Sequence, residues 1–162
     1  MRLTSSLFFF GVVAVCTADL YYNPASPIEE VAVCPGEGPR YQDYKCNHDS
    51  THRVCARLVD NTDGKCDELS WDDEDPDHPR SFWDITNQER WNWKDKVCAA
   101  PNPGDSWCIC MWATASLIKK VGCDNVHIRC EATSVNYMME KYTDGGVDLA
   151  DAKLCLQKKC LQ

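Results

Sequence analysis

The stretch SWCICMW, residues 106–112, is a short run of mainly apolar residues, and ATASLIKKVG, residues 113–122, follows it directly. The first stretch predicts a buried strand. In the second stretch, apolar residues recur at helical spacing and a glycine stands where helices commonly end. These residues are Ala113, Leu117, Ile118, Val121 and Gly122. The sequence therefore predicts a strand that runs straight into a helix.

Two further stretches alternate between apolar and polar residues, THRVCARLVD at 51–60 and VHIRCEA at 126–132. Each pattern predicts a half-buried strand. Thr133 or Ser134 can cap a helix over residues 135–142, and we expect a last helix near residues 148–159. Because no internal repeat is visible, we predict a single small α+β domain, with a short β-sheet and packed helices.

The first 40 residues differ in composition from the rest. A basic start, the apolar run LFFFGVVAV at 7–15 and small residues up to Ala18 predict a signal peptide over 1–18. Residues 19–40 hold four prolines and predict an irregular arm over the surface. The α+β domain is then expected over 41–162, with an acidic loop near 67–80. We therefore expect a secreted, extracellular protein.

Cysteine is unusually frequent, with twelve in 162 residues. Cleavage after Ala18 would remove Cys16 and leave eleven, a density typical of an exported, disulfide-rich protein. Since eleven is odd, we expect one cysteine without a partner in the chain, available for a covalent dimer or an extracellular protein partner. The sequence does not determine which cysteines pair.

The net charge is −8, and losing Arg2 with the signal peptide would lower it by one. Such an acidic chain argues against nucleic acid and anionic membrane surfaces as partners, and no later segment is apolar enough for a membrane span. The sequence holds no nucleotide-binding loop, hydrolase elbow or metalloprotease motif. We expect no cofactor.

Several ordered motifs resemble one known family. GDSWCIC at 104–110, followed by a predicted helix and then by EAT at 131–133, is similar to the pattern PGD-x-WC-x-C…EAT of the bacterial domain-of-unknown-function family 2237. The segment 41–47 and HRVCA at 52–56 resemble that family's tyrosine-to-cysteine segment and its HTVCA strand. The similarity covers roughly residues 41–140.

This resemblance implies a small α+β fold and no particular activity. The family usually has histidine after EAT, whereas Ser134 stands here, so a family function using that histidine is in doubt for this chain. Four cysteines fall on family-like motifs: Cys46, Cys55, Cys108 and Cys110. The other seven are expected to be disulfide-forming staples: Cys34, Cys66, Cys98, Cys123, Cys130, Cys155 and Cys160. Cys108 and Cys110 should not bond to each other, because they share one strand face.

A candidate thiol or metal cluster comes from sulfur and imidazole groups, which could hold a metal or activate a thiolate. Its members are Cys46, His52, Cys55, Cys108 and Cys110. The alternative, which we favour, is ordinary disulfides beside a structural histidine, because an oxidising compartment consumes thiols.

The sequence offers three other candidate sites. A calcium loop could use the carboxylates of Asp72, Asp73, Glu74, Asp75 and Asp77, although a solvated loop is the simpler interpretation. Glycan stacking could use Trp71, Trp83, Trp91 and Trp93, although burial of these indoles under the disulfide-tied loops is the interpretation we favour. A glycosidase-like acid pair could combine Asp84 or Glu89 with Glu131.

We interpret the chain as a secreted, disulfide-stabilised protein that binds or takes part in an extracellular assembly, and less readily as an enzyme. The alternatives are an enzyme or metal site around His52, Cys55, Cys108 and Cys110, and carbohydrate binding through the loop tryptophans.

Overall fold

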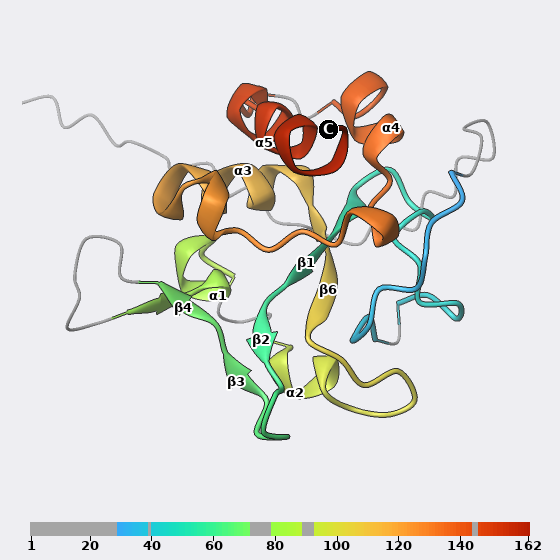
Figure 1. The fold of residues 1–162 in the computed structure, drawn as a ribbon, viewed down its shortest axis with the longest axis vertical. Helices are drawn as coiled ribbons and strands as arrows, with labels where there is room; N and C mark the ends of the chain where they lie inside the picture. The colour runs from blue at the N-terminus through green and yellow to red at the C-terminus, as the bar shows by residue number, and fades with distance from the viewer. Residues whose placement is uncertain (1–28, 39, 72–78, 89–92, 144–145) are drawn as a thin grey trace, which may run out of the picture.

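The computed structural model describes residues 29–38, 40–71, 79–88, 93–143 and 146–162. The fold is a small, disulfide-rich α+β domain (Figure 1). The predicted signal peptide and the predicted calcium ligands at 72–77 lie outside the described residues.

The centre of the fold is an antiparallel pair of strands, β1 (His52–Arg57) and β6 (Ser106–Cys110). Cys55 lies opposite Cys108 in this pair, and Val54 lies opposite Ile109. Strand residues alternate between faces, so the pair sends its aliphatic side chains to one side and the cysteines Cys55 and Cys108 to the other. This alternation creates two separate cores.

Two small antiparallel pairs continue the chain after β1. One joins β2 (Val59–Asp60) to β3 (Asp67–Glu68), and the other joins β4 (Ser70–Trp71) to β5 (Arg80–Ser81). The strand predicted over 51–60 is thus confirmed in two pieces, β1 and β2. Short helices α1 (Phe82–Ile85) and α2 (Lys94–Val97) follow, and neither was predicted.

The predicted strand-to-helix junction is confirmed, but it lies two residues earlier than expected. β6 ends at Cys110, and α3 (Met111–Val121) begins at the next residue. The other expected helices are α4 (Val135–Glu140) and α5 (Ala150–Cys160). Figure 1 shows α3, α4 and α5 gathered at one end of the β1–β6 pair, with β3 and α2 toward the other end.

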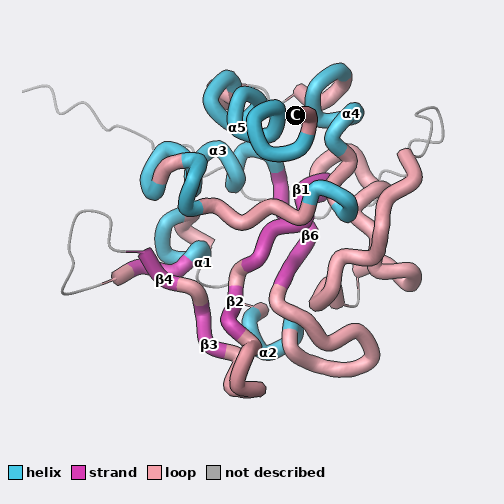
Figure 2. Tube along the Cα trace, in the orientation of Figure 1, coloured by secondary structure: helices cyan, strands magenta, loops and turns pink. Residues whose placement is uncertain are grey.

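The prediction of a strand over 126–132 is wrong. The backbone N–H of Arg57 donates to His127 O, and that of Arg129 donates to Cys55 O, but only Ala56 and Ile128 form a bridge. The chain then turns into the 3-10 helix η3 (Cys130–Ala132), and a similar turn, η2, covers Cys123–Asn125. The alternating pattern therefore reflects a brief contact with the edge of β1, which Figure 2 draws as loop.

The main core lies between the β1–β6 pair and the helices. Val54 and Ile109 from the strands, Leu117 of α3 and Leu156 of α5 are all buried in it. The second cluster, on the opposite side, consists of Cys34, Cys46, Cys55, Cys108 and Ala132. Sulfur therefore replaces aliphatic packing on one face of the central strands.

The described part of the predicted arm, residues 29–38, contains no helix or strand, but it is built into the fold instead of lying loosely over it. The backbone N–H of Ala32 donates to Glu131 O, and Pro35 O accepts from the backbone N–H groups of Asp105 and Ser106. The Glu29 carboxylate accepts from the first turn of α4, at Asn136 N and Tyr137 N, where the sequence predicted a Thr133 or Ser134 side-chain cap.

Five disulfides join described residues: Cys34–Cys55, Cys46–Cys108, Cys66–Cys98, Cys123–Cys155 and Cys130–Cys160. All seven predicted staple cysteines are thus confirmed as disulfide-forming, and Cys108 and Cys110 do not pair with each other. The division into motif cysteines and later staples does not hold, because Cys34 bonds to Cys55. Across the described residues, no helix is both long and apolar enough to span a membrane.

Candidate site at the paired disulfides

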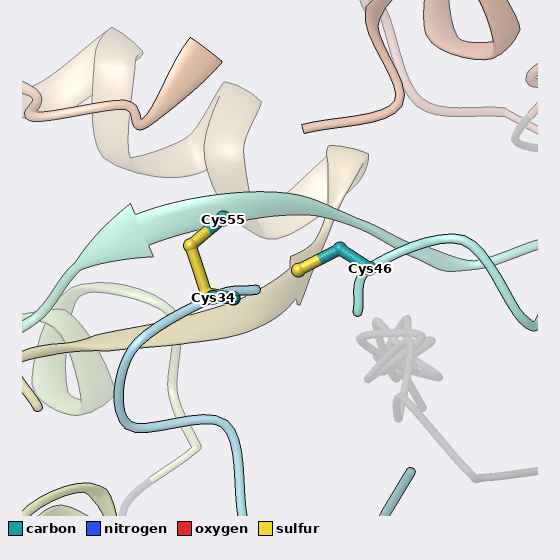
Figure 3. A group of neighbouring side chains, drawn as sticks. All are labelled: Cys34, Cys46 and Cys55. Atoms are coloured by element: carbon teal, nitrogen blue, oxygen red, sulfur yellow. A yellow bond between two sulfur atoms is a disulfide. The ribbon is translucent and has the colours of Figure 1, made fainter. Parts of the chain in front are cut away.

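Two disulfides lie next to each other under the β1–β6 pair. Cys55 and Cys108 face each other across the strands, Cys34 reaches Cys55 from the arm, and Cys46 reaches Cys108 from the loop before β1. The Sγ atoms of Cys34, Cys46 and Cys55 all lie within 4.8 Å of one another (Figure 3). Cys108 Sγ is bonded to Cys46 Sγ and so adjoins this group of three without belonging to it.

These four cysteines are fully buried, each with a relative exposure of 0%. Tyr41 is the partly buried hydrophobic residue that packs against them. The disulfides therefore form a dry cluster that solvent does not reach in the folded protein.

The predicted thiol or metal cluster is corrected in one respect, since its cysteines are not thiols. Cys46, Cys55 and Cys108 are in the disulfides above, Cys110 is also disulfide-bonded, and no cysteine in the described part of the chain is free. The expected unpaired cysteine is therefore not found. That expectation depended on losing Cys16, because the whole chain has an even number of cysteines.

His52 is held by Asp49 instead of joining the sulfurs. The Asp49 Oδ2 atom lies 2.8 Å from His52 Nδ1, and Oδ1 accepts from the backbone N–H groups of Thr51 and His52. An ionised carboxylate only accepts, so Nδ1 carries the proton and Nε2 keeps its lone pair. Within the described residues Nε2 makes no hydrogen bond, and His52 is absent from the close group of ligand atoms.

The surroundings favour a neutral imidazole and an ionised aspartate. Burial lowers the pKa of His52, and the hydrogen bond to Asp49 only partly opposes this. Burial alone would raise the pKa of Asp49, but the hydrogen bond and charge of His52 and the Tyr41 hydroxyl, which donates to Asp49 Oδ2, lower it overall. The arrangement fits a base or an oriented ligand histidine.

A buried glutamate lies on the β6 side of the cluster. Glu37 has a relative exposure of 0%, and its Oε2 accepts from the backbone N–H of Cys108 at 2.8 Å. Arg40 Nε lies 3.8 Å from Oε1, and Arg40 also donates from its guanidinium to Cys108 O. Burial raises the pKa of Glu37 to about 7, against the opposing influence of Arg40.

The described tryptophans of the predicted glycan site each contact other parts of the protein. Trp83 is buried with a relative exposure of 4%, so it cannot stack on a glycan. Trp71 donates its indole N–H to Asn125 O, and Trp93 packs edge-to-face on Trp107. Trp91 lies outside the described residues.

One member of the predicted acid pair, Asp84, is bonded within a helix cap. Asp84 accepts from the backbone N–H and hydroxyl of Ser81 in the capping box of α1, which occupies its carboxylate. Glu89 lies outside the described residues. Asp84 therefore has a structural role at a helix end.

Four polar residues beside the sulfurs were missed from the sequence: Glu37, Arg40, Tyr41 and Asp49. Asp49 could have been found, since an aspartate three positions before a histidine is suited to bond both its backbone and its ring. Nothing local indicates the burial of Glu37, because glutamate is rarely buried. No protein-family model, curated protein or solved structure matches this chain.

Proposed function

We propose that this chain is a secreted, disulfide-stabilised protein that binds another protein, and that the outer face of α5 is the binding surface. The observation that carries this proposal is the exposure of Leu154 and Leu161, at 64% and 51%. Leu154 lies in α5 and Leu161 directly follows it, and both line the same hollow. Apolar side chains gathered in one exposed patch are typical of protein-binding surfaces.

The two leucines border a hollow of about 440 Å³ at the C-terminal end of α5. The side chains that line it are Leu154, Gln157, Lys158, Leu161 and Gln162. Such a hollow is suited to one apolar side chain of a partner, with glutamines available for hydrogen bonds at its rim.

The charge of α5 indicates what kind of partner fits. The helix carries three lysines, Lys153, Lys158 and Lys159, and a single aspartate, Asp151, and Lys158 is paired with Asp124 outside the helix. These groups together carry one net positive charge, whereas the whole chain has 17 basic and 25 acidic residues. A locally positive surface on an acidic protein favours an acidic partner segment. We therefore expect a partner segment with an apolar anchor flanked by carboxylates.

Two disulfides hold this surface in place. Cys155 of α5 is bonded to Cys123, and Cys160 is bonded to Cys130. A helix fixed in this way loses little conformational freedom on binding, which lowers the free-energy cost of association. Disulfides of this number also suit an extracellular site of action.

The rival proposal is an enzyme or metal site at His52, and the Asp49–His52 hydrogen bond of 2.8 Å favours it. Against catalysis stands the disulfide bonding of the neighbouring cysteines, which removes the nucleophile. Carbohydrate binding through tryptophans has less support, since Trp83 is buried. Membership of the domain-of-unknown-function family 2237 also stays a proposal.

A peptide array tests the binding surface. The array pairs leucine or phenylalanine with flanking glutamates, and a matched set carries lysines instead. We expect the acidic set to bind the oxidised full chain, more weakly at higher salt. Leu154→Ser and Leu161→Ser should each weaken binding at least tenfold, while Val33→Ser, at a residue 46% exposed and outside α5, should not.

Two results would overturn the proposal. One is no preference for the acidic peptides, and the other is equal losses in Leu161→Ser and Val33→Ser. Sedimentation of the chain alone shows whether a second copy occupies the same face, in which case Leu161→Ser should dissociate it. Hydrolytic turnover that is lost in His52→Gln but retained in Leu161→Ser would favour the enzyme.

A further inference from the structure

The paired disulfides have a second chemical state, in which both are reduced. We propose that Cys34, Cys46, Cys55 and Cys108 then bind one thiophilic divalent metal of the Zn²⁺ class through their four thiolates. This inference concerns a different place in the fold from the α5 surface and does not depend on it.

The spacing of the sulfurs carries the proposal. Zinc holds four thiolates tetrahedrally at about 2.3 Å, which places neighbouring sulfurs about 3.8 Å apart. The Sγ atoms of Cys34, Cys46 and Cys55 already lie within 4.8 Å of one another. The fourth sulfur, Cys108 Sγ, is bonded to Cys46 Sγ and lies outside this closest group. Reduction frees the bonded sulfurs to move apart from about 2 Å, and metal binding then requires Cys108 Sγ to move closer to the other sulfurs.

The backbone presents the four residues from four separate segments. The arm supplies Cys34, the next loop Cys46, β1 Cys55 and β6 Cys108. The backbone hydrogen bonds of the β1–β6 pair keep Cys55 and Cys108 opposite each other whether or not the disulfides are present. Because the four cysteines are far apart in sequence, they do not show the short ligand spacing by which zinc knuckles are recognised.

The environment suits a charged metal–thiolate group. The site is closed to solvent, since all four cysteines have a relative exposure of 0%. A divalent metal with four thiolates carries two net negative charges, and the Arg40 guanidinium, bonded to Cys108 O, lies beside it to compensate.

The other disulfides do not share this geometry. Among the described residues, Cys34, Cys46 and Cys55 are the group of three or more His, Cys, Asp or Glu ligand atoms found this close together. That group contains no cysteine from the other three described disulfides, which are Cys66–Cys98, Cys123–Cys155 and Cys130–Cys160. These pairs therefore provide matched controls.

The two disulfides and the metal-bound thiolates are related by electron and proton transfer. A dithiol or phosphine reductant gives each disulfide two electrons, and two protons are taken up, so both together yield four thiols. Binding of M²⁺ displaces the thiol protons as the thiolates form. In the reverse direction, a disulfide oxidant removes four electrons from the four thiolates, both S–S bonds form and the metal ion leaves.

The test uses the full chain, completely reduced with a phosphine and then titrated with Co²⁺ and Zn²⁺. We expect one metal per chain, with the charge-transfer absorption of a Co²⁺–thiolate complex. Alkylation with one equivalent of Zn²⁺ present, mapped by mass spectrometry, should spare Cys34, Cys46, Cys55 and Cys108. It should modify Cys66, Cys98, Cys123, Cys130, Cys155 and Cys160.

Two variants complete the test. Cys46→Ser should weaken Co²⁺ binding at least tenfold, and Cys66→Ser should leave it unchanged. Less than one metal bound per chain, protection of the outer cysteines as strong as that of the four, or equal losses in both variants would each overturn the proposal. If Cys46→Ser does not fold, the alkylation map of the unaltered chain decides the question.

Discussion

Glu37 and Cys108 are 71 positions apart in sequence, yet the Glu37 carboxylate accepts the backbone N–H of Cys108 at 2.8 Å, from a position with no solvent exposure. The second oxygen, Oε1, is buried and has no hydrogen-bond partner among the described residues. A carboxyl in this position is more stable with its proton, because burial raises its pKa to about 7.

Glu37 should make the protein less stable as the pH rises. Between the unfolded pKa of about 4.3 and the folded value of about 7, the unfolded chain releases this proton while the folded chain keeps it. The free energy of unfolding should therefore fall across that window, by on the order of 3 kcal/mol from this group. Urea unfolding at a series of pH values measures it.

The matched variants are Glu37→Gln and Glu30→Gln. Glu37→Gln, which cannot ionise, should remove the fall between pH 4.5 and 7 and leave the rise expected from His52, whose pKa is lowered by burial. Glu30→Gln should not, because its side chain is 85% exposed. An unchanged slope in Glu37→Gln would show that another group governs this window.

Asp49 should have the opposite dependence. Its carboxylate accepts from the Tyr41 hydroxyl, from His52 Nδ1 and from two backbone N–H groups, and these bonds lower its pKa. Its stabilising contribution is therefore complete above the unfolded pKa of about 3.9 and is lost as the pH falls below it.

Asp49→Asn should lower the free energy of unfolding at pH 7 by about 2 kcal/mol, because the amide cannot accept from all four donors. The control is Asp43→Asn, whose side chain is 48% exposed and pairs with His48; we expect a change under about 0.5 kcal/mol. The difference between Asp49→Asn and the natural chain should shrink in acid. Equal effects of the two substitutions at pH 7 would argue against the Asp49 network.

Local sequence patterns were sufficient for the central elements and insufficient for their surroundings. The run into α3 was predictable because strand and helix each bury a face whose spacing is visible in the sequence. The alternating pattern at 126–132 led to the wrong prediction of a strand, because a brief contact with the edge of β1 produces the same alternation as a full strand. Residues brought together over long separations, such as Glu37 and Cys108, leave no local pattern.

In the candidate site too, residue types could be selected from the sequence, but their long-range contacts could not. His52 and the motif cysteines could be selected by residue type, but whether their sulfurs were thiols depended on Cys34, which reaches Cys55 from the arm. Disulfide connectivity is a property of the folded geometry, and the number of cysteines does not determine it.

Gly104 should tolerate no side chain. A Cβ atom there would lie 2.1 Å from the carbonyl carbon of Pro35, and backbone cannot move aside as a flexible side chain does. Gly104→Ala should therefore destabilise the protein by about 3 kcal/mol or more. Gly64→Ala is the control, since its Cβ meets no atom within 4 Å and only its φ of +70° carries a cost, about 1 kcal/mol. Thermal unfolding should separate the two, and similar losses would contradict the close approach.

Arg129 should matter more for stability than an exposed ion pair. Its Nη2 atom donates to both carboxylate oxygens of Asp105, at 2.8 and 2.9 Å, while its Nε atom donates to the Ser106 hydroxyl at 2.8 Å. These bonds tie the segment beside β1 to the start of β6. A lysine ammonium cannot reach both partners in this planar arrangement, so Arg129→Lys should cost about 1 kcal/mol, a value reduced by partial exposure.

Lys158 gives the comparison, because its ammonium lies 2.7 Å from Asp124 with both side chains largely exposed. Lys158→Gln should change the free energy of unfolding by less than about 0.5 kcal/mol, and the change should vanish in high salt. The loss in Arg129→Lys should persist in high salt, since it comes from lost hydrogen-bond geometry with the charge retained. If both losses disappeared with salt, Arg129 would act through charge alone.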